Sequence, residues 1–373
     1  MNKNTISLFN TYPDLKYKKY DNKYTGLNPL SVYEYLNNKL TLSYSSLDKY
    51  YRCPFSYYLT KILKLDIYDT TFPQVVGNIF HAILEKRNST SLTYDELWNQ
   101  ELLNTNYSFS SKESFFLKKL KQELKFIIET IDNQEELTTL HNELHEEEII
   151  TNIDESRNIT FKGYIDKVKY KTENDETIAA IIDYKTGHPN IDLTTLPYGI
   201  GMQLPVYLYL LKHSSKIHNV KIAGFYLQKI LNNEIKVETG KTYEQLKKKN
   251  LLLQGYSNSD LSILSSFDSS YNESHMIDGM KTKKDGSISS KKILSSKEID
   301  FLAEEVEKKI KEGANLIVDS IFTIAPKEIG NKDYGCSMCK YNDICFHTNK
   351  DIVSLPSKEL KEILGSDNNE LDN

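Results

Sequence analysis

Cysteine is scarce in this chain, with four residues among 373, and tryptophan occurs once. No apolar run approaches the roughly 18 residues that a transmembrane helix needs. Residues 1–24 also lack the apolar core of a secretory signal peptide. We therefore expect a cytoplasmic protein with no membrane association. In that compartment disulfides are disfavoured, so the few cysteines are better suited to metal binding.

The chain also lacks a strong charge of either sign, since its formal net charge is −5 at pH 7. This balance is not that of a uniformly basic nucleic-acid-binding protein. Lysines nevertheless gather in the run Lys247–Lys249 and in a second cluster. The second cluster consists of Lys281, Lys283, Lys284, Lys291 and Lys292. Each group fits either a local basic groove for phosphates or ordinary solvated surface.

The order of the sequence patterns predicts an α/β fold, with a mixed central sheet flanked by helices. One helix is expected to begin near Ser43, with Ser45 or Ser46 as its N-cap, and to break at Pro54. Further helices are expected at 73–86, 93–103, 111–131, 198–213, 242–253 and 296–314, and strands at 148–153, 158–170, 177–186 and 220–230. A polar insert is expected near 256–295.

Three segments follow from this order of elements. Residues 1–41 are predicted to be an extended lead-in, and residues 349–373 an acidic tail. Residues 42–348 between them would form a single α/β domain.

The four cysteines are divided between two distant parts of the chain. Cys53 stands alone, and Cys336, Cys339 and Cys345 form a C-x2-C-x5-C motif that begins 283 positions later. Four thiolates complete one tetrahedral zinc site or one iron–sulfur cluster. Zinc sites more often use two close pairs, so this spacing favours the cluster while leaving zinc open. Either centre would clamp the two ends of the domain together.

Two carboxylates and a lysine mark the predicted sheet. Asp166 lies in FKGYIDKVKY, and Asp183 and Lys185 lie in AAIIDYKTG. Residues i and i+2 of a strand share a face, so Asp183 and Lys185 point one way and Tyr184 the other. Such a set suits Mg²⁺-dependent phosphodiester hydrolysis, because Mg²⁺ prefers carboxylate ligands. Taken by itself, D-x-K also fits an exposed strand end with a salt bridge.

Three further residues strengthen the hydrolase interpretation. His81 lies in GNIFHAILE, and Gln203 and Tyr207 occupy one helix face at i and i+4 in QLPVYLYLL. The chain resembles RecB-family nucleases of the PD-(D/E)XK superfamily. The resemblance is carried by the motifs quoted above around His81, Asp166, Asp183 and Gln203, and by the strings SYSSLDKYYRCPFSYYL and CSMCKYNDIC. The chain is most similar there to the C-terminal nuclease domain of the AddB family of helicase–nuclease subunits.

This resemblance implies a restriction-endonuclease-like core closed by a [4Fe–4S] cluster. It implies that Mg²⁺ is held by His81, Asp166, Asp183 and the Tyr184 carbonyl. Lys185 would be the catalytic lysine, with Gln203 and Tyr207 orienting the lysine and the scissile phosphate. The cluster ligands would be Cys53, Cys336, Cys339 and Cys345. The chain departs from the superfamily pattern at Ile165, which stands where the name-giving proline would precede Asp166.

The implied activity is that of a Mg²⁺-dependent exonuclease on single-stranded DNA ends, in double-strand break repair and recombination. The 5′-ended strand would be the substrate, and an AddA-type helicase–nuclease subunit the partner. No nucleotide-binding loop is present, because Gly240-Lys241-Thr242 lacks the required first glycine, at Ile235. Two alternatives stay open: a free-standing exonuclease of a mobile element, and a non-cleaving iron–sulfur module that binds DNA or acts as a scaffold.

Overall fold

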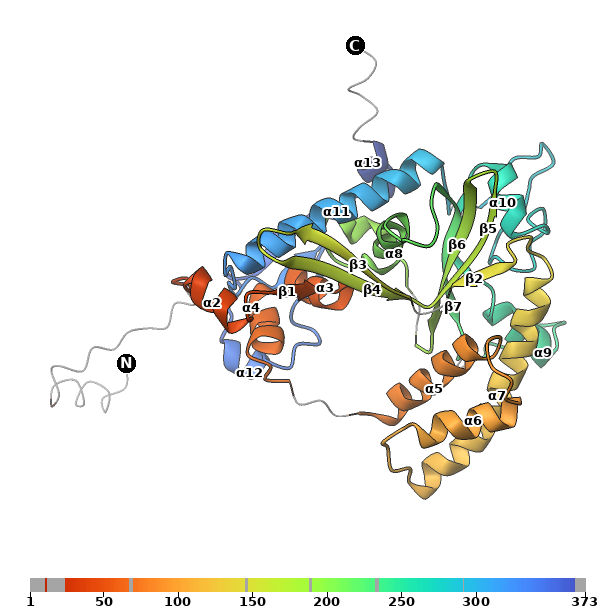
Figure 1. Cartoon of the computed structure of the whole chain (residues 1–373), viewed down its shortest axis with the longest axis horizontal. Coiled ribbons are helices and arrows are strands. Elements are labelled where there is room, and N and C mark those ends of the chain that lie inside the picture. Colours follow the sequence, from red (N-terminus) through yellow and green to blue (C-terminus); the bar gives the residue numbers. More distant parts are fainter. Residues whose placement is uncertain are drawn as a thin grey trace, which may run out of the picture.

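A six-stranded mixed sheet forms the centre of the molecule, which is a computed structural model (Figure 1). The structure describes residue 11 and residues 24–66, 70–144, 147–187, 190–231, 235–290 and 292–365. The strands of the central sheet, in spatial order, are β2 (Asn142–Leu144), β5 (Lys167–Glu173), β6 (Glu176–Lys185), β7 (Val220–Lys229), β8 (Gln254–Asn258) and β9 (Ile293–Leu294). Strand β6 runs antiparallel to β5 and parallel to β7.

Helices cover both faces of this sheet, and the side chains of β6 alternate between two hydrophobic cores. Ala179 and Ile181 belong to one core, whereas Ala180, Ile182 and Tyr184 belong to the other. The helices of the first core include α3 (Tyr44–Arg52), α8 (Gln203–Lys212) and α11 (Ser296–Val318). Those of the second are α5 (Phe72–Lys86), α6 (Tyr94–Leu103), α7 (Ser111–Glu135) and α10 (Leu261–Phe267). The predicted α/β class, with a mixed sheet between helices, is confirmed.

A second sheet lies beside the first and shares a continuous stretch of chain with it. Its strands are β1 (Leu40–Leu42), β4 (Ile159–Ile165) and β3 (Glu147–Asp154), with β4 in the middle. Strand β4 ends at Ile165 and β5 begins at Lys167, so the chain changes sheets at Asp166. The single predicted strand over 158–170 is therefore two strands in two sheets, and Asp166 lies at the junction.

The C-terminal part packs against the N-terminal helices. Here a third sheet joins β11 (Lys332–Asp333), β10 (Lys327–Ile329) and β12 (Val353–Leu355). The remaining elements are α2 (Pro29–Tyr35), α4 (Pro54–Tyr57), the π-helix η1 (Tyr58–Ile62), the 3₁₀-helix η2 (Leu193–Tyr198), α9 (Tyr243–Asn250), α12 (Asn342–Cys345) and α13 (Leu360–Gly365). Figure 1 shows α12 close to α3 and α4, so the two ends of the chain's core lie together.

Several expected elements differ in detail from the structure. Helix α3 is capped by Ser43 and not by Ser45 or Ser46, because the Ser43 side chain accepts from the Ser46 backbone. Pro54 does interrupt the helix, but as the first residue of α4. Helix α8 begins only at Gln203, since Gly199 and Gly201 adopt positive φ angles that end helical geometry.

The predicted lead-in and insert both contain regular structure. Asn28 caps α2 within the expected lead-in, so residues 29–35 are helical and not extended. The expected polar insert at 256–295 includes the end of β8, all of α10 and β9. The C-terminal segment includes β12, which pairs with β10. Residues 1–10, 12–23 and 366–373 lie outside the described residues, and the three-segment division stays a prediction.

No helix within the described ranges combines the length and the apolar character needed to cross a bilayer.

Candidate active site and cysteine site

Asp183 and Lys185 lie at the end of β6 and share a face, as their spacing predicts. The Lys185 Nζ lies 2.5 Å from the Asp183 Oδ2, and Tyr184 packs on the opposite side of the strand. Asp183 is 1% exposed, whereas the lysine side chain is 30% exposed. The pair therefore places a buried carboxylate behind a lysine that reaches solvent.

Helix α8 supplies two donors to the same carboxylate. The Gln203 Nε2 donates to Asp183 Oδ1 at 2.9 Å, and the Tyr207 hydroxyl donates to the same oxygen at 3.1 Å. Gln203 Nε2 also lies 2.7 Å from the Tyr207 hydroxyl, because residues i and i+4 share a helix face. The structure thus brings both residues to Asp183, where they fix the orientation of its carboxyl group.

The second oxygen of Asp183 is buried and is held by Lys185, whose Nζ lies 2.5 Å from this Oδ2. No other donor reaches it from the described residues. Burial, followed by the charge of Asp166, raises the pKa of Asp183 to about 6. Two neighbouring carboxylates of which one is deeply buried favour the binding of a further cation.

Asp166 and His81 form the other half of the site. The Asp166 Oδ2 accepts from the Tyr184 backbone nitrogen at 2.9 Å and lies 3.2 Å from the His81 Nδ1. Burial opposes protonation of His81, but the hydrogen bond and charge of Asp166 outweigh it and raise its pKa. The sheet junction at Asp166 therefore brings its carboxylate to the end of β6, beside Asp183.

Helix α5 carries His81 to this point through a close contact with β6. A Cβ on Gly77 would lie 3.3 Å from the Thr186 Oγ1, so the glycine lets the helix approach the strand end. His81 follows one turn later on the same face. This contact gives the G-x-x-x-H spacing a structural reason.

These residues fit a divalent cation of the hard, oxygen-preferring kind. Two carboxylates and an imidazole converge, and the Asp183 Oδ2, which Lys185 approaches, is a ready oxygen ligand. No group of three or more His, Cys, Asp or Glu side chains in the described ranges already has metal-binding geometry. The fit therefore rests on donor chemistry and on the closeness of the two carboxylates.

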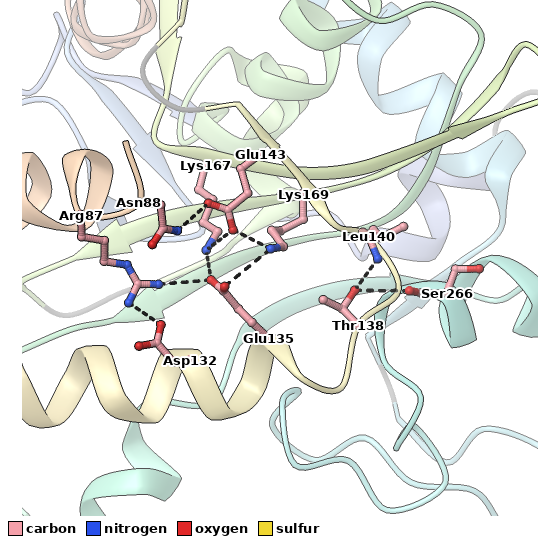
Figure 2. A network of polar contacts seen from close by, with 10 residues as sticks. All are labelled: Arg87, Asn88, Asp132, Glu135, Thr138, Leu140, Glu143, Lys167, Lys169 and Ser266. Carbon is pink, nitrogen blue, oxygen red and sulfur yellow. Dashed lines mark hydrogen bonds and ion pairs between the residues drawn. The ribbon is translucent and has the colours of Figure 1, made fainter. Parts of the chain in front are cut away.

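A second group of charges begins at the residue after Asp166, and Figure 2 shows this group. Lys167, which follows Asp166, is 2% exposed and pairs with Glu135 and Glu143. Lys169 lies 2.5 Å from the Glu143 Oε1. Arg87, just after α5, lies 3.3 Å from the Glu135 Oε1. This network connects α5, α7, β2 and β5, which are the elements around His81 and Asp166.

All four cysteines line one small cavity, as the clamp hypothesis requires. Cys53 lies between α3 and α4, and the other three come from the loop after β11 and from α12. All four are free thiols. Burial raises the pKa of the Cys53 thiol and, with the charge of Asp333, raises that of Cys336 to about 12. Desolvated, converging thiols are the donor set that a metal centre would deprotonate and bind.

Sequence reasoning did not single out His347 in this cavity. Its Nε2 lies 3.6 Å from the Cys336 Sγ, and its Nδ1 lies 3.3 Å from the Cys345 Sγ. The only signal in the sequence is its position two residues after the last cysteine. Arg52, Lys332 and Tyr334, which line the cavity at Lys185, were missed as well.

The lysine run is not a set of unpaired charges facing this site. Lys247 pairs with Glu123 at 2.5 Å, and Lys248 and Lys249 each have a glutamate partner. The second cluster includes Lys291, which lies outside the described residues. None of the other lysines in the two groups, all of them described, lines the cavity at Lys185.

A buried and a half-buried acid, a lysine and a histidine at the end of a mixed sheet define a site suited to metal-assisted hydrolysis. A sequence profile of the PD-(D/E)XK nuclease superfamily matches residues 41–346. The chain therefore belongs to this superfamily, and the prediction of a nuclease, a phosphodiester hydrolase, is confirmed at this level.

Curated relatives refine the similarity. The chain is 27% identical to an ATP-dependent helicase/deoxyribonuclease subunit of the AddB type from Clostridium perfringens, over 89% of this chain and 32% of the relative. The protein of the same name from Caldanaerobacter subterraneus is 26% identical over 92% of this chain and 33% of its own length. The protein of that name from Carboxydothermus hydrogenoformans is 27% identical over 89% of this chain and 34% of its own length. The chain thus spans about a third of these relatives, and the resemblance to AddB subunits is confirmed.

Proposed function

We propose that this chain is a Mg²⁺-dependent DNA exonuclease that acts on single-stranded ends, on the 5′-ended strand. One observation carries the proposal most: the buried carboxylate of Asp183 lies beside that of Asp166, and among the described residues its Oδ2 is held only by Lys185. An oxygen of this kind is suited to a divalent cation. The membership of a nuclease superfamily makes a DNA phosphodiester the substrate class that fits best.

Each residue of the site has a role in this proposal. Mg²⁺, when bound, would supply Lewis acidity and lower the pKa of a water molecule. Asp166, Asp183, His81 and the Tyr184 carbonyl would hold it. Lys185 would take a proton from the attacking water or offset charge on the phosphate. Gln203 and Tyr207 would keep the Asp183 carboxylate oriented, which is the contact they already make.

The larger assembly is part of the same proposal. The relatives are named as subunits of an ATP-dependent helicase/deoxyribonuclease, and this chain corresponds to about a third of each. We infer that it works as the nuclease part of an AddAB-type complex in double-strand break repair and recombination, with an AddA-type partner. The cytoplasmic location stays a prediction.

Cleavage by the full chain tests the nuclease proposal. Asp183→Ala should reduce Mg²⁺-dependent cleavage of an end-labelled single-stranded oligonucleotide by roughly a thousandfold or more, because it removes a buried ligand. Asp300→Ala, at an exposed residue on α11, is the matched control and should cleave like the wild type. Cleavage by the Asp183 variant at the wild-type rate would exclude this site.

We further propose that the four cysteines hold a [4Fe–4S] cluster. Their convergence on one cavity supports this, together with the wide sequence separation of Cys53 from the others. A cluster that joins these segments would close a loop of 283 positions, which stabilises a fold by about 5 kcal/mol on a chain-entropy estimate.

Iron content and stability test this second part. Cys53→Ser should remove the iron and lower the denaturation midpoint, although Cys53 lies outside the catalytic residues. Met338→Ala, at a 93% exposed position between two of the cysteines, should keep both. A Cys53 variant with full iron content and an unchanged midpoint would refute the proposed ligand set.

A further inference from the structure

A cavity of about 420 Å³ extends from the proposed catalytic residues toward the cysteine-bearing end of the chain. Lys185 and Gln203 line one part of it, and Arg52, Lys332 and Tyr334 line another. We propose that Arg52 and Lys332 form a subsite for a phosphate of the DNA strand, next to the phosphate that is cleaved. The proposal deepens the nuclease function and rests on it.

Two positive charges surround one aromatic ring in this cavity. The Arg52 Cζ lies 5.6 Å from the centroid of the Tyr334 ring, and the Lys332 Nζ lies 4.9 Å from it. Contacts with the ring face favour each cation, and Arg52 is already paired with Asp48. Lys332 is exposed, and no carboxylate lies within ion-pair distance of it in the described part of the chain. A bound phosphate would supply the counter-charge that Lys332 lacks.

A tight hairpin presents Lys332 to the cavity. Strands β10 and β11 are joined by Gly330 and Asn331, which both have positive φ angles, of 53° and 66°. This is the geometry of a two-residue type I′ turn, in which Ile329 pairs with Lys332. The backbone that carries the lysine is therefore fixed before any ligand arrives.

The side chain of Arg52 is also held in place, and one of its guanidinium nitrogens is still free to donate. Its Nε lies 2.6 Å from the Asp48 Oδ2, and its Nη1 donates to the Tyr334 carbonyl at 3.2 Å. Asp48 also accepts from the Gly201 backbone at 2.9 Å, two residues before Gln203. Arg52 is thus tied to the start of α8, and its Nη2 has no partner among the residues placed by the structure.

The acidic residues of the cavity are engaged elsewhere. Asp192 accepts from the Thr194 backbone at 3.0 Å, and Asp333 accepts from the Cys336 backbone at 2.7 Å. Both carboxylates order their own loops. Neither forms an ion pair with Lys332 among the described residues, so this lysine is available to a polyanion whose backbone reaches Lys185.

Binding of a single-stranded oligonucleotide by the full chain, measured without Mg²⁺, tests the subsite. Lys332→Ala should weaken binding about fivefold and reduce the slope of log K against log salt by about 0.7, the value for one phosphate contact on a single strand. Lys332→Arg should bind like the wild type, since it keeps the charge. Lys297→Ala removes an exposed lysine of α11 that does not line the cavity, and it should change neither quantity.

The outcomes separate the subsite from the nuclease proposal. If the wild type binds but does not cleave with Mg²⁺, and Lys332→Ala alone weakens binding, the phosphate contact of Lys332 stands as a DNA-binding contact, and only the nuclease function fails. The subsite is refuted if Lys332→Ala keeps the wild-type affinity and salt slope. Equal losses in the Lys332 and Lys297 variants, or no binding by the wild type, would refute it too.

Discussion

Two buried groups of charges begin at adjacent residues, Asp166 and Lys167, and they differ in how well their charges are satisfied. In the network of Figure 2, each buried lysine has glutamate partners, and three cations face three carboxylates. In the candidate active site, Asp183 is as deeply buried, but Asp183 and Asp166 have only one lysine, Lys185, and one histidine, His81, as cationic partners among the residues described above. The first group is balanced by its own side chains, whereas the second has one carboxylate more than it has lysines and is suited to a bound cation.

The difference indicates that the two groups of charges have different roles. The complete network fixes α5, α7 and β5 around His81 and Asp166, so that the incomplete site keeps its shape while no metal ion is bound. Residues in energetically unfavourable surroundings persist where neighbouring structure holds them. The network should therefore matter for stability, and Asp183 for function.

The largest expected effect on stability comes from breaking the complete network. Lys167→Met leaves an excess buried carboxylate charge and should lower the free energy of unfolding by about 3 kcal/mol. Urea denaturation of the full chain measures this. Lys171→Met removes a partly exposed partner of Glu173 on the same strand and should cost less than about 0.5 kcal/mol.

A double variant sharpens the test. Lys167→Met combined with Glu135→Gln removes one charge of each sign, so the network is balanced again. The pair should therefore lose less stability than the sum of the two single changes. Equal effects of Lys167→Met and Lys171→Met would show that the buried network contributes no more than a surface pair.

The incomplete site was largely predictable from the sequence, because its pattern is local. The alternation of AAIIDYK predicts which face Asp183 shares with Lys185, and the i, i+4 spacing predicts that Gln203 meets Tyr207. Both contacts exist. What the spacing could not predict is that Gln203 and Tyr207 contact Asp183, since that depends on where α8 crosses the sheet.

The complete network and the proposed phosphate subsite could not be predicted, because their partners are distant in sequence. K-V-K-Y has the alternation of a strand with one solvated face, yet Lys167 is buried by Glu135, which lies 32 residues earlier. The change of sheets at Asp166 is likewise invisible in a continuous β pattern. Lys332 and Arg52 line one cavity only because the segment at β11 packs against α3.

A smaller effect, on the pH dependence of stability, tests the incomplete site. The folded-state pKa of Asp183 lies near 6, above its usual 3.8. The folded state therefore holds this proton more tightly than the unfolded state. In Mg²⁺-free protein the contribution of the Asp183 proton to the free energy of unfolding is fully present below about pH 4, and it is lost as the pH rises through about 6. The slope reaches at most about 1.4 kcal/mol per pH unit.

The difference in unfolding free energy between wild type and Asp183→Asn isolates this contribution, because other groups that titrate in both proteins largely cancel. This difference, wild type minus variant, should fall between about pH 4 and 7. Addition of Mg²⁺ at about pH 7 should raise the melting temperature of the wild type but not that of the variant. Asp300→Asn, at an exposed ion pair with Lys212, should give a nearly flat difference. A flat or rising difference for Asp183→Asn would mean that Lys185 and the hydrogen bonds of Asp183 already balance its carboxylate without a metal ion, and the contrast with the Lys167 network would then disappear.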